Sequence, residues 1–126
     1  MSEMVSYIKE IDKTFFYKRN KTTIADVAPG DIVCIKVQNP LHYGARDLTY
    51  FGRIEKITRC YFWVIEYCGP VSEYSSTVTD CSTDFFNHAN SDPGRLLKKW
   101  AKTSLLEIWE ADTESRVVET TIWKSK

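Results

Sequence analysis

The sequence lacks any long apolar run, and no segment approaches the roughly 18 to 20 apolar residues that a membrane-spanning helix needs. It also lacks the basic start and apolar stretch of a secretory signal, because it opens with MSEMVSYIKEIDK. Phosphate-binding loops, dinucleotide-binding turns and paired CxxC zinc motifs are missing as well. We therefore expect a cytoplasmic protein without contact to a membrane, and we find no motif that fixes an enzymatic reaction.

An excess of one charge is also missing, since 17 Lys and Arg residues balance 17 Asp and Glu residues. The protein thus has no overall field that would attract nucleic acid or an acidic membrane. Its charges are nevertheless unevenly placed: no Lys or Arg lies between Cys60 and Gly94, whereas basic residues gather near Lys18 and Lys98. Separate patches of opposite sign favour a protein partner, and they would also allow a homo-oligomer.

The composition is that of an ordinary globular protein, with 43% hydrophobic and 27% charged residues. A chain of 126 residues fits one domain, so we expect residues 1–126 to form a single unit. We expect the four cysteines to be reduced thiols, because two of them lie inside strand-like apolar runs.

The middle of the sequence predicts three strands. Pro29 and Gly30 are suited to a tight turn that leads into a strand at 31–37, and further strands follow near 49–58 and 61–68. The last of these is apolar on both faces, which predicts a central place in the sheet with a cover on its second side. An N-terminal helix, a helix at 93–102 or a partner protein could be that cover. Its two faces are Tyr61, Trp63, Ile65 and Tyr67 on one side, and Phe62, Val64 and Cys68 on the other.

The flanking segments predict one or two helices. Helical spacing of apolar residues favours a helix at 3–16, although the same segment alternates nearly well enough for a pair of short strands. Asp92 as N-cap and Pro93 at the first position favour a helix at 93–102. Between 69 and 92 the chain is rich in Ser, Thr, Asp and Asn, which suggests a mobile region with a weak strand near 76–81.

From residue 105 onward the pattern is extended, and the turn-like DTES at 112–115 predicts a C-terminal hairpin of 105–111 with 116–123. Together these elements indicate a mainly β (α+β) fold. We expect a small curled antiparallel sheet, or a partly open barrel, of five or six strands with one or two helices.

The order APGDIVCIKV, loop, YFGRIEKIT, turn, YFWVIEY resembles the start of small β-barrel modules of the Src-homology-three kind, such as bromo-adjacent homology, Tudor and ribosomal-protein-type domains. The resemblance covers residues 28–68. It implies a curled antiparallel sheet whose loops and aromatic face bind peptides, modified side chains or nucleic acid. After Cys68 the sequence departs from these families, and this puts the ligand class in doubt more than the fold.

Two groups of residues in this region are candidates for binding. An aromatic face could take an extended peptide or a cation, although the simpler interpretation is that these rings form the core and its cover. The long loop between the first two predicted strands is the second candidate. The aromatic group is Tyr50, Tyr61, Trp63 and Tyr67, and the loop group is His42, Tyr43 and Arg46.

Basic residues alternate with aromatic ones in KTFFYKRNK, and Lys18, Arg19 and Lys21 could follow a phosphate backbone. The alternative is a solvated basic patch, since so few cations allow only a few phosphate contacts. Cysteine and histidine could also bind zinc, but their spacing is unlike that of known zinc motifs, so we expect neither a metal nor a cofactor. The weak zinc candidates are Cys60, Cys68, Cys81 and His88.

These observations favour a non-enzymatic binding module that recognises a protein through an aromatic sheet face and loops. One alternative is a nucleic-acid or chromatin-type reader. Another is a small inhibitor or adaptor of the viral or phage type that binds host defence or regulatory machinery. A hydrolase that uses Cys81 and His88 also stays open, because the two residues need only be adjacent in space.

Overall fold

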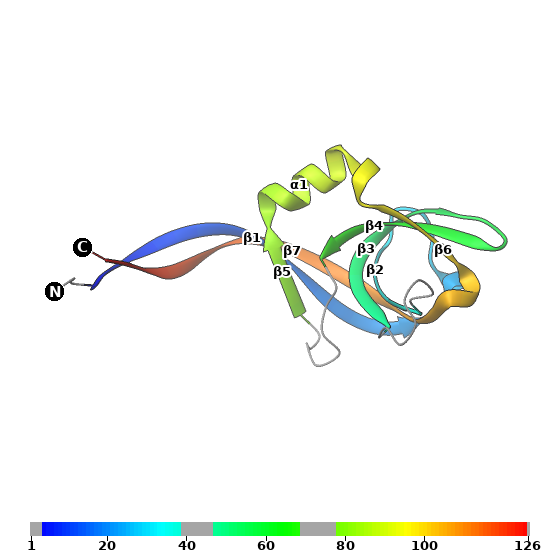
Figure 1. The fold of residues 1–126 in the computed structure, drawn as a ribbon. Helices are drawn as coiled ribbons and strands as arrows, with labels where there is room; N and C mark the ends of the chain where they lie inside the picture. The colour runs from blue at the N-terminus through cyan, green and yellow to red at the C-terminus, as the bar shows by residue number, and fades with distance from the viewer. Residues whose placement is uncertain (1–3, 39–46, 69–77, 126) are drawn as a thin grey trace.

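The fold is an antiparallel sheet with one α-helix on it, seen in a computed structural model that describes residues 4–38, 47–68 and 78–125 (Figure 1). Seven strands pair in the order β5-β1-β7-β2-β3-β4-β6. In chain order the elements are β1 (Met4–Thr22), β2 (Ile32–Val37), β3 (Leu48–Ile57), β4 (Tyr61–Cys68), β5 (Val78–Ser82), α1 (Thr83–Ser91), β6 (Leu97–Ala101) and β7 (Leu105–Ser125), with 3₁₀ turns at Ile24–Asp26, Pro93–Arg95 and Lys102–Ser104.

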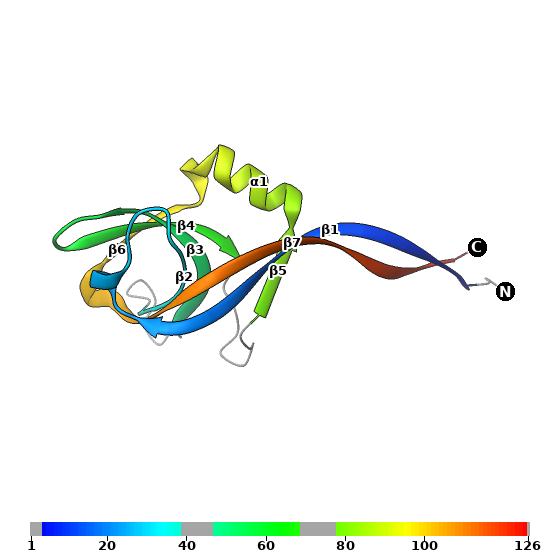
Figure 2. The same cartoon turned by 180° about the vertical axis from the view of Figure 1, so that it is seen from behind.

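The described residues thus form a mainly β fold with a helix, and the antiparallel sheet curls without closing, as the sequence predicted (Figure 2). The sheet has seven strands, however, and not the expected five or six. The predicted turn before β2 is present: Gly30 has a φ of 96°, and its N–H donates to the carbonyl of Ile54 over 2.7 Å. Asp31 holds the same turn by accepting a 2.8 Å hydrogen bond from the N–H of Ala28. No helix in the described residues is long and apolar enough to cross a membrane.

The curl separates two apolar clusters, because successive side chains on a strand point to opposite faces. The inner cluster lies inside the curl and receives Ile35 from β2, Ile54 from β3 and Phe62 from β4. The outer cluster lies on the opposite face and contains Cys34 and Phe51 from the same strands. Each strand in the middle of the sheet therefore contributes to both clusters.

Strand β4 confirms the prediction that its two apolar faces are both used. It pairs with β3 on one side and β6 on the other, so it is not an edge strand. Phe62 and Val64 belong to the inner cluster, and Ile65 and Tyr67 belong to the outer one. The cover over the outer cluster is α1 and not one of the expected helices. It lies within 69–92, the segment for which we predicted mobility, and β5 is the weak strand predicted there.

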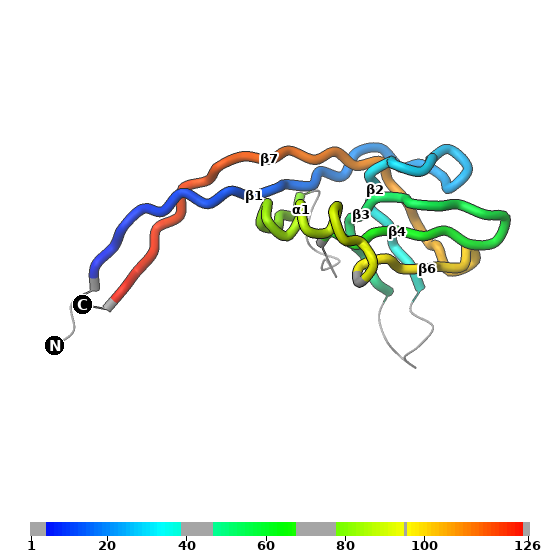
Figure 3. The backbone as a smooth tube through the Cα atoms, turned by 90° about the horizontal axis from the view of Figure 1, so that it is seen from above, coloured from blue at the N-terminus to red at the C-terminus, as the bar shows by residue number. Residues whose placement is uncertain are grey.

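The N- and C-terminal strands form a long two-stranded arm. Pairing between β1 and β7 runs from Met4 opposite Ser125 to Asp12 opposite Val117 and onward into the body. β5 borders β1 only from Lys13 to Tyr17, and β2 borders β7 only up to Glu110. Residues 4–12 and 117–125, here called the arm, therefore project from the body with both chain ends at the tip (Figure 3).

Three sequence predictions are corrected by these strands. Residues 4–16 are not a helix, because they belong to β1 and pair with β7; they form one long strand and not the pair of short strands that we weighed as the alternative. Residues 93–102 form a 3₁₀ turn followed by β6, since this segment pairs with β4. The C-terminal hairpin is absent, because the turn-like residues 112–115 pair with β1 and β7 continues without a turn.

Candidate functional site

Helix α1 covers only part of the outer face of β4. Its N-cap is Ser82, whose hydroxyl accepts a 3.1 Å hydrogen bond from the N–H of Phe85, and Pro93 follows its end. Its buried side packs Phe86 on Tyr67, with ring centroids 4.9 Å apart. The cover extends along β4 as far as Ile65, which is fully buried.

Polar contacts fix the position of this helix on the sheet. The side-chain oxygen of Asn90 accepts hydrogen bonds from the hydroxyl of Tyr67 and from a guanidinium N–H of Arg53, each over 2.6 Å. The amide nitrogen of Asn90 in turn donates to the carbonyl of Phe86 over 3.2 Å. Tyr67 is buried and Arg53 lies on the paired strand β3, so this network fixes the position of α1 on the sheet. The helix leaves the other end of β4 uncovered.

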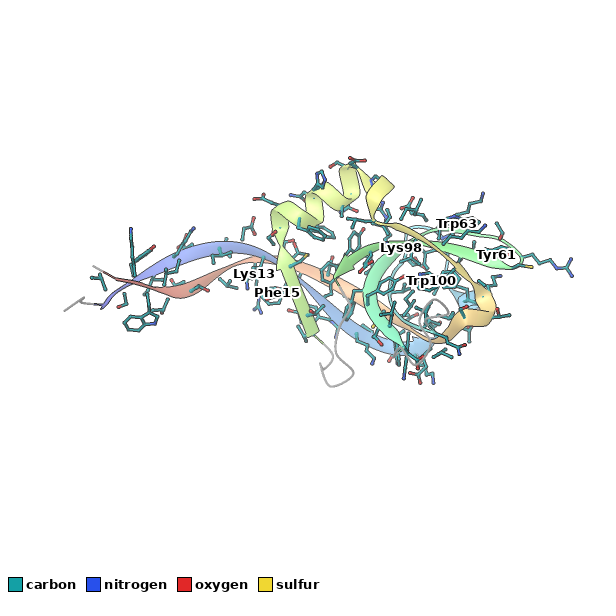
Figure 4. All side chains as sticks on the ribbon, viewed as in Figure 1. Lys13, Phe15, Tyr61, Trp63, Lys98 and Trp100 are labelled. Atoms are coloured by element: carbon teal, nitrogen blue, oxygen red, sulfur yellow. The ribbon has the colours of Figure 1, made fainter. Side chains whose placement is uncertain are left out.

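The uncovered end of β4 carries two aromatic side chains on the same face. Tyr61 is 42% exposed and Trp63 is partly exposed, with ring centroids 6.4 Å apart. They stand on β4 close to the turn that joins it to β3, away from α1 (Figure 4). Neighbouring strands place three more side chains on this face, and we call the whole set the outer patch: Lys56, Tyr61, Trp63, Leu97 and Lys99.

The lysines of the outer patch lie against its rings. The ammonium nitrogen of Lys99 is 4.2 Å from the ring centroid of Tyr61, and that of Lys56 is 4.9 Å from the ring centroid of Trp63. Such contacts orient the cations and are worth about 0.5–1 kcal/mol each at exposed sites. The ion pairs found among the described residues involve neither lysine, so both ammonium groups can still accept a carboxylate partner.

The other two aromatic residues of the predicted binding face are in the core. Tyr50 is 2% exposed and faces the inner cluster, where Trp100 donates a hydrogen bond to its hydroxyl. Tyr67 is equally buried under α1. Because both rings are buried, neither can contact a ligand. Burial also raises the pKa of both phenols, so they stay uncharged. The structure thus divides the predicted aromatic face into two exposed and two buried members.

The predicted basic group near the bulge of β1 contacts side chains of β7. Arg19 forms an ion pair with Asp112 at 2.6 Å, and Lys21 forms one with Glu107 at 3.4 Å. The ammonium nitrogen of Lys18 lies 3.7 Å from the ring centroid of Trp109. A hollow of about 420 Å³ opens beside Arg19, and Asp112 and Asp31 also line it. Acidic neighbours therefore offset these cations, which weakens their case as phosphate ligands.

The remaining candidates lie on different elements or outside the described residues. The latter applies to His42, Tyr43 and Arg46 and to the side chain of Cys68. Cys60 is exposed in the turn between β3 and β4, whereas Cys81 is on β5 and His88 is exposed on α1. Within the described part of the chain no group of three or more His, Cys, Asp or Glu residues could hold a metal ion.

Sequence reasoning missed Lys56, Leu97 and Lys99 as members of the outer patch. Two of them lie in the segment that we predicted to be a helix, where Leu97 would have belonged to a buried face. The alternation of LLKKWA was the available signal, because it places Leu97, Lys99 and Ala101 on one side of a strand and Trp100 on the other.

Comparison of the chain with protein-family models, curated proteins and solved structures finds no match.

Proposed function

We propose that this protein is a non-enzymatic binding module that recognises another protein through the outer patch. The observation that carries the proposal is the partial cover of β4: α1 buries Ile65 and Tyr67 and leaves Tyr61 and Trp63 of the same face to solvent. Exposed Tyr and Trp side chains beside apolar and cationic neighbours are the usual composition of the centre of a protein interface.

The chemistry of the patch defines the class of partner. Lys56 and Lys99 flank the rings on two sides and lack carboxylate partners among the described residues. A partner with an apolar side chain surrounded by Asp or Glu would cover the rings and neutralise both cations. Strand β6 is an edge of the sheet in the described part of the chain, so an extended acidic segment could also add to it by main-chain pairing.

Nucleic acid is the second candidate, because exposed rings beside lysines can stack bases and bind phosphates. Two observations favour protein over nucleic acid. The lysines already lie over the faces of Tyr61 and Trp63, where a base would stack. The zero net charge and the ion-paired Arg19 and Lys21 also leave little further positive surface for a phosphate backbone.

A capture experiment with matched variants tests the proposal. The immobilised protein is exposed to an extract of its source cells, with and without nuclease treatment, and compared with a Tyr61→Ala/Trp63→Ala variant. Leu106→Ala is the control, since Leu106 is an exposed apolar residue outside the patch. We expect a partner protein retained by the unchanged chain and by the control, and an affinity at least about tenfold lower for the patch variant.

Stability measurements separate loss of binding from loss of fold. Trp63 is partly exposed, so Trp63→Ala should lower the free energy of unfolding by only about 1 kcal/mol. Retention that the patch variant does not reduce would contradict the proposal. Retention that nuclease removes, with a steep salt dependence, would move the function to nucleic-acid binding.

A further inference from the structure

The arm presents an unpaired strand edge. β1 from Met4 to Asp12 has β7 on one side, and no other described strand lies on the other. At Lys13 this edge is closed by β5, and the hydroxyl of Thr83 at the start of α1 donates to Asp12 over 3.1 Å. Residues 4–12 therefore form an edge segment with a defined inner end, whose midpoint is Ile8.

The side chains of the arm are too apolar for a ribbon that stays in water. Ile8 is 66% exposed, Trp123 is 63% exposed, and Tyr7 and Val117 are also exposed. Two-stranded ribbons are marginally stable in water by themselves, and long apolar edges are usually paired or covered in native proteins. These properties favour a partner that adds strands to the arm.

The charge pattern of the β1 edge fits a second copy of the same edge. Antiparallel pairing about Ile8 would place Ile8 opposite its own copy, Val5 opposite Ile11 and Tyr7 opposite Lys9. Every position of the segment from Met4 to Asp12 would then have a partner, and no like charges would face each other.

Neighbouring registers are poorer. Centring the pair on Lys9 would place two lysines opposite each other, and centring it on Glu10 would place two glutamates opposite each other. Centring it on Tyr7 avoids like charges and pairs Tyr7 with its copy, but it places Ile8 opposite Ser6 and Val5 opposite Lys9, so both aliphatic pairs of the Ile8-centred register are lost. The Ile8-centred register is therefore the one that the sequence supports.

We propose that the protein forms a two-fold symmetric dimer in which the β1 edges of two arms pair antiparallel about Ile8. The result is a four-stranded sheet in the order β7-β1-β1-β7. Four strands can form a stable sheet in water, whereas the two strands of a single arm are only marginally stable. The interface is distinct from the outer patch, so the dimer goes beyond the proposed function and does not depend on it.

The mass in solution is the first test. Light scattering or sedimentation should give twice the chain mass of 14.6 kDa, with dissociation on dilution. Ile8→Lys places two cations opposite each other at the two-fold axis and should raise the dissociation constant about tenfold or more. Val117→Lys is the matched control: Val117 is exposed on the same face of the arm but on β7, and this variant should dimerise like the unchanged chain.

Disulfide trapping tests the register. In a Cys60→Ser background, Ile8→Cys should form a disulfide-linked dimer on mild oxidation, because directly opposite residues have Cα atoms about 4.5–5.5 Å apart. Thr121→Cys is the control, since Thr121 lies opposite Ile8 within one arm. Its two copies would be three strand spacings apart, about 14 Å, and should not link.

Several results would overturn the proposal. A monomeric mass at the highest soluble concentration would mean that the β1 edge does not bind a second copy. A dimer that Ile8→Lys leaves intact, or one that links through Thr121→Cys in preference to Ile8→Cys, would place the contact elsewhere. Ile8 and Val117 are both largely exposed, so we expect neither lysine substitution to unfold the protein. Circular dichroism verifies that both variants are folded.

Discussion

The indole N–H of Trp100 donates a hydrogen bond to the hydroxyl oxygen of Tyr50, which joins β6 to β3 across the inside of the curled sheet. The two rings are tilted against each other with centroids 6.4 Å apart. β6 and β3 are not neighbours in the sheet, because β4 lies between them. This bond therefore holds the curvature of the sheet in addition to satisfying two polar groups.

Removing the acceptor should leave a polar group inside the curl without a partner. Tyr50→Phe is expected to lower the free energy of unfolding by about 1–2 kcal/mol, measured by urea denaturation, because the indole N–H of Trp100 loses its acceptor. The double variant with Trp100→Phe is the control and should cost less than the sum of the single changes. Additive costs would show that the bond contributes nothing to stability.

Gly52 is expected to tolerate no side chain. It lies where the register between β3 and β4 shifts, and a Cβ there would overlap the carbonyl oxygen of Ile65 and come within 2.5 Å of a methyl carbon of Val64. We expect Gly52→Ala to lower the free energy of unfolding by about 3 kcal/mol. Gly94→Ala is the matched control, because its Cβ would meet only Asp92 at 3.8 Å, and a similar loss there would contradict this explanation.

Asn90 should determine how firmly α1 is held. Asn90→Ala removes the acceptor that Tyr67 and Arg53 share and leaves the buried hydroxyl of Tyr67 without its partner. The expected cost is about 2 kcal/mol of unfolding free energy, together with faster amide hydrogen exchange in α1 than in β3. Asn87→Ala is a control on the exposed side of the helix. Unchanged exchange in α1 would mean that packing of Phe86 alone fixes the helix.

The carboxyl group of Glu66 is expected to make stability depend on pH. Burial raises its pKa above the ordinary value of 4.5, and the charge of Lys98 opposes this rise. Because the pKa of Glu66 is higher in the folded protein, folding favours its protonated form. The resulting contribution to the free energy of unfolding is complete below pH 4.5, and it is lost as the pH rises through the pKa of the folded protein.

Glu66→Gln should therefore be more stable than the unchanged chain at neutral pH and should remove that part of the pH dependence. Urea denaturation from acidic to neutral pH measures both effects. A Glu66→Gln variant that is less stable at neutral pH would show that the attraction to Lys98 outweighs the cost of burial.

The three middle strands could be predicted because their signals are local. Pro29 and Gly30 make the turn, short apolar-rich runs make β2 and β3, and the doubly apolar β4 predicts its own central position. The helix at 83–91 also had local signals, namely Ser82 as N-cap, Phe86 and Ala89 on one face, and Pro93 after its end. Because many Ser, Thr and Asp residues surround these helix signals, we predicted a mobile region there and not a helix.

The other elements depend on partners that are distant in the sequence. Residues 4–12 have a pattern that suits a helix or a strand, and only pairing with the C-terminal strand decides between them. Asp112 to Ser115 have the composition of a turn, but Phe15 and Phe16 lie opposite them and continue the strand. For the same reason the outer patch could be predicted only in part: Tyr61 and Trp63 were visible on β4, whereas Lys99 reaches them through the pairing of β6 with β4.

The position of β7 has a consequence for synthesis of the protein. This strand comes last along the chain, yet it lies in the sheet between β1 and β2, which come first. During synthesis the β7-facing edges of β1 and β2 therefore stay unpaired until β7 itself has emerged from the ribosome. Pairing of β1 with β7 joins segments that are far apart in the sequence, so we expect it to be a slow step of folding.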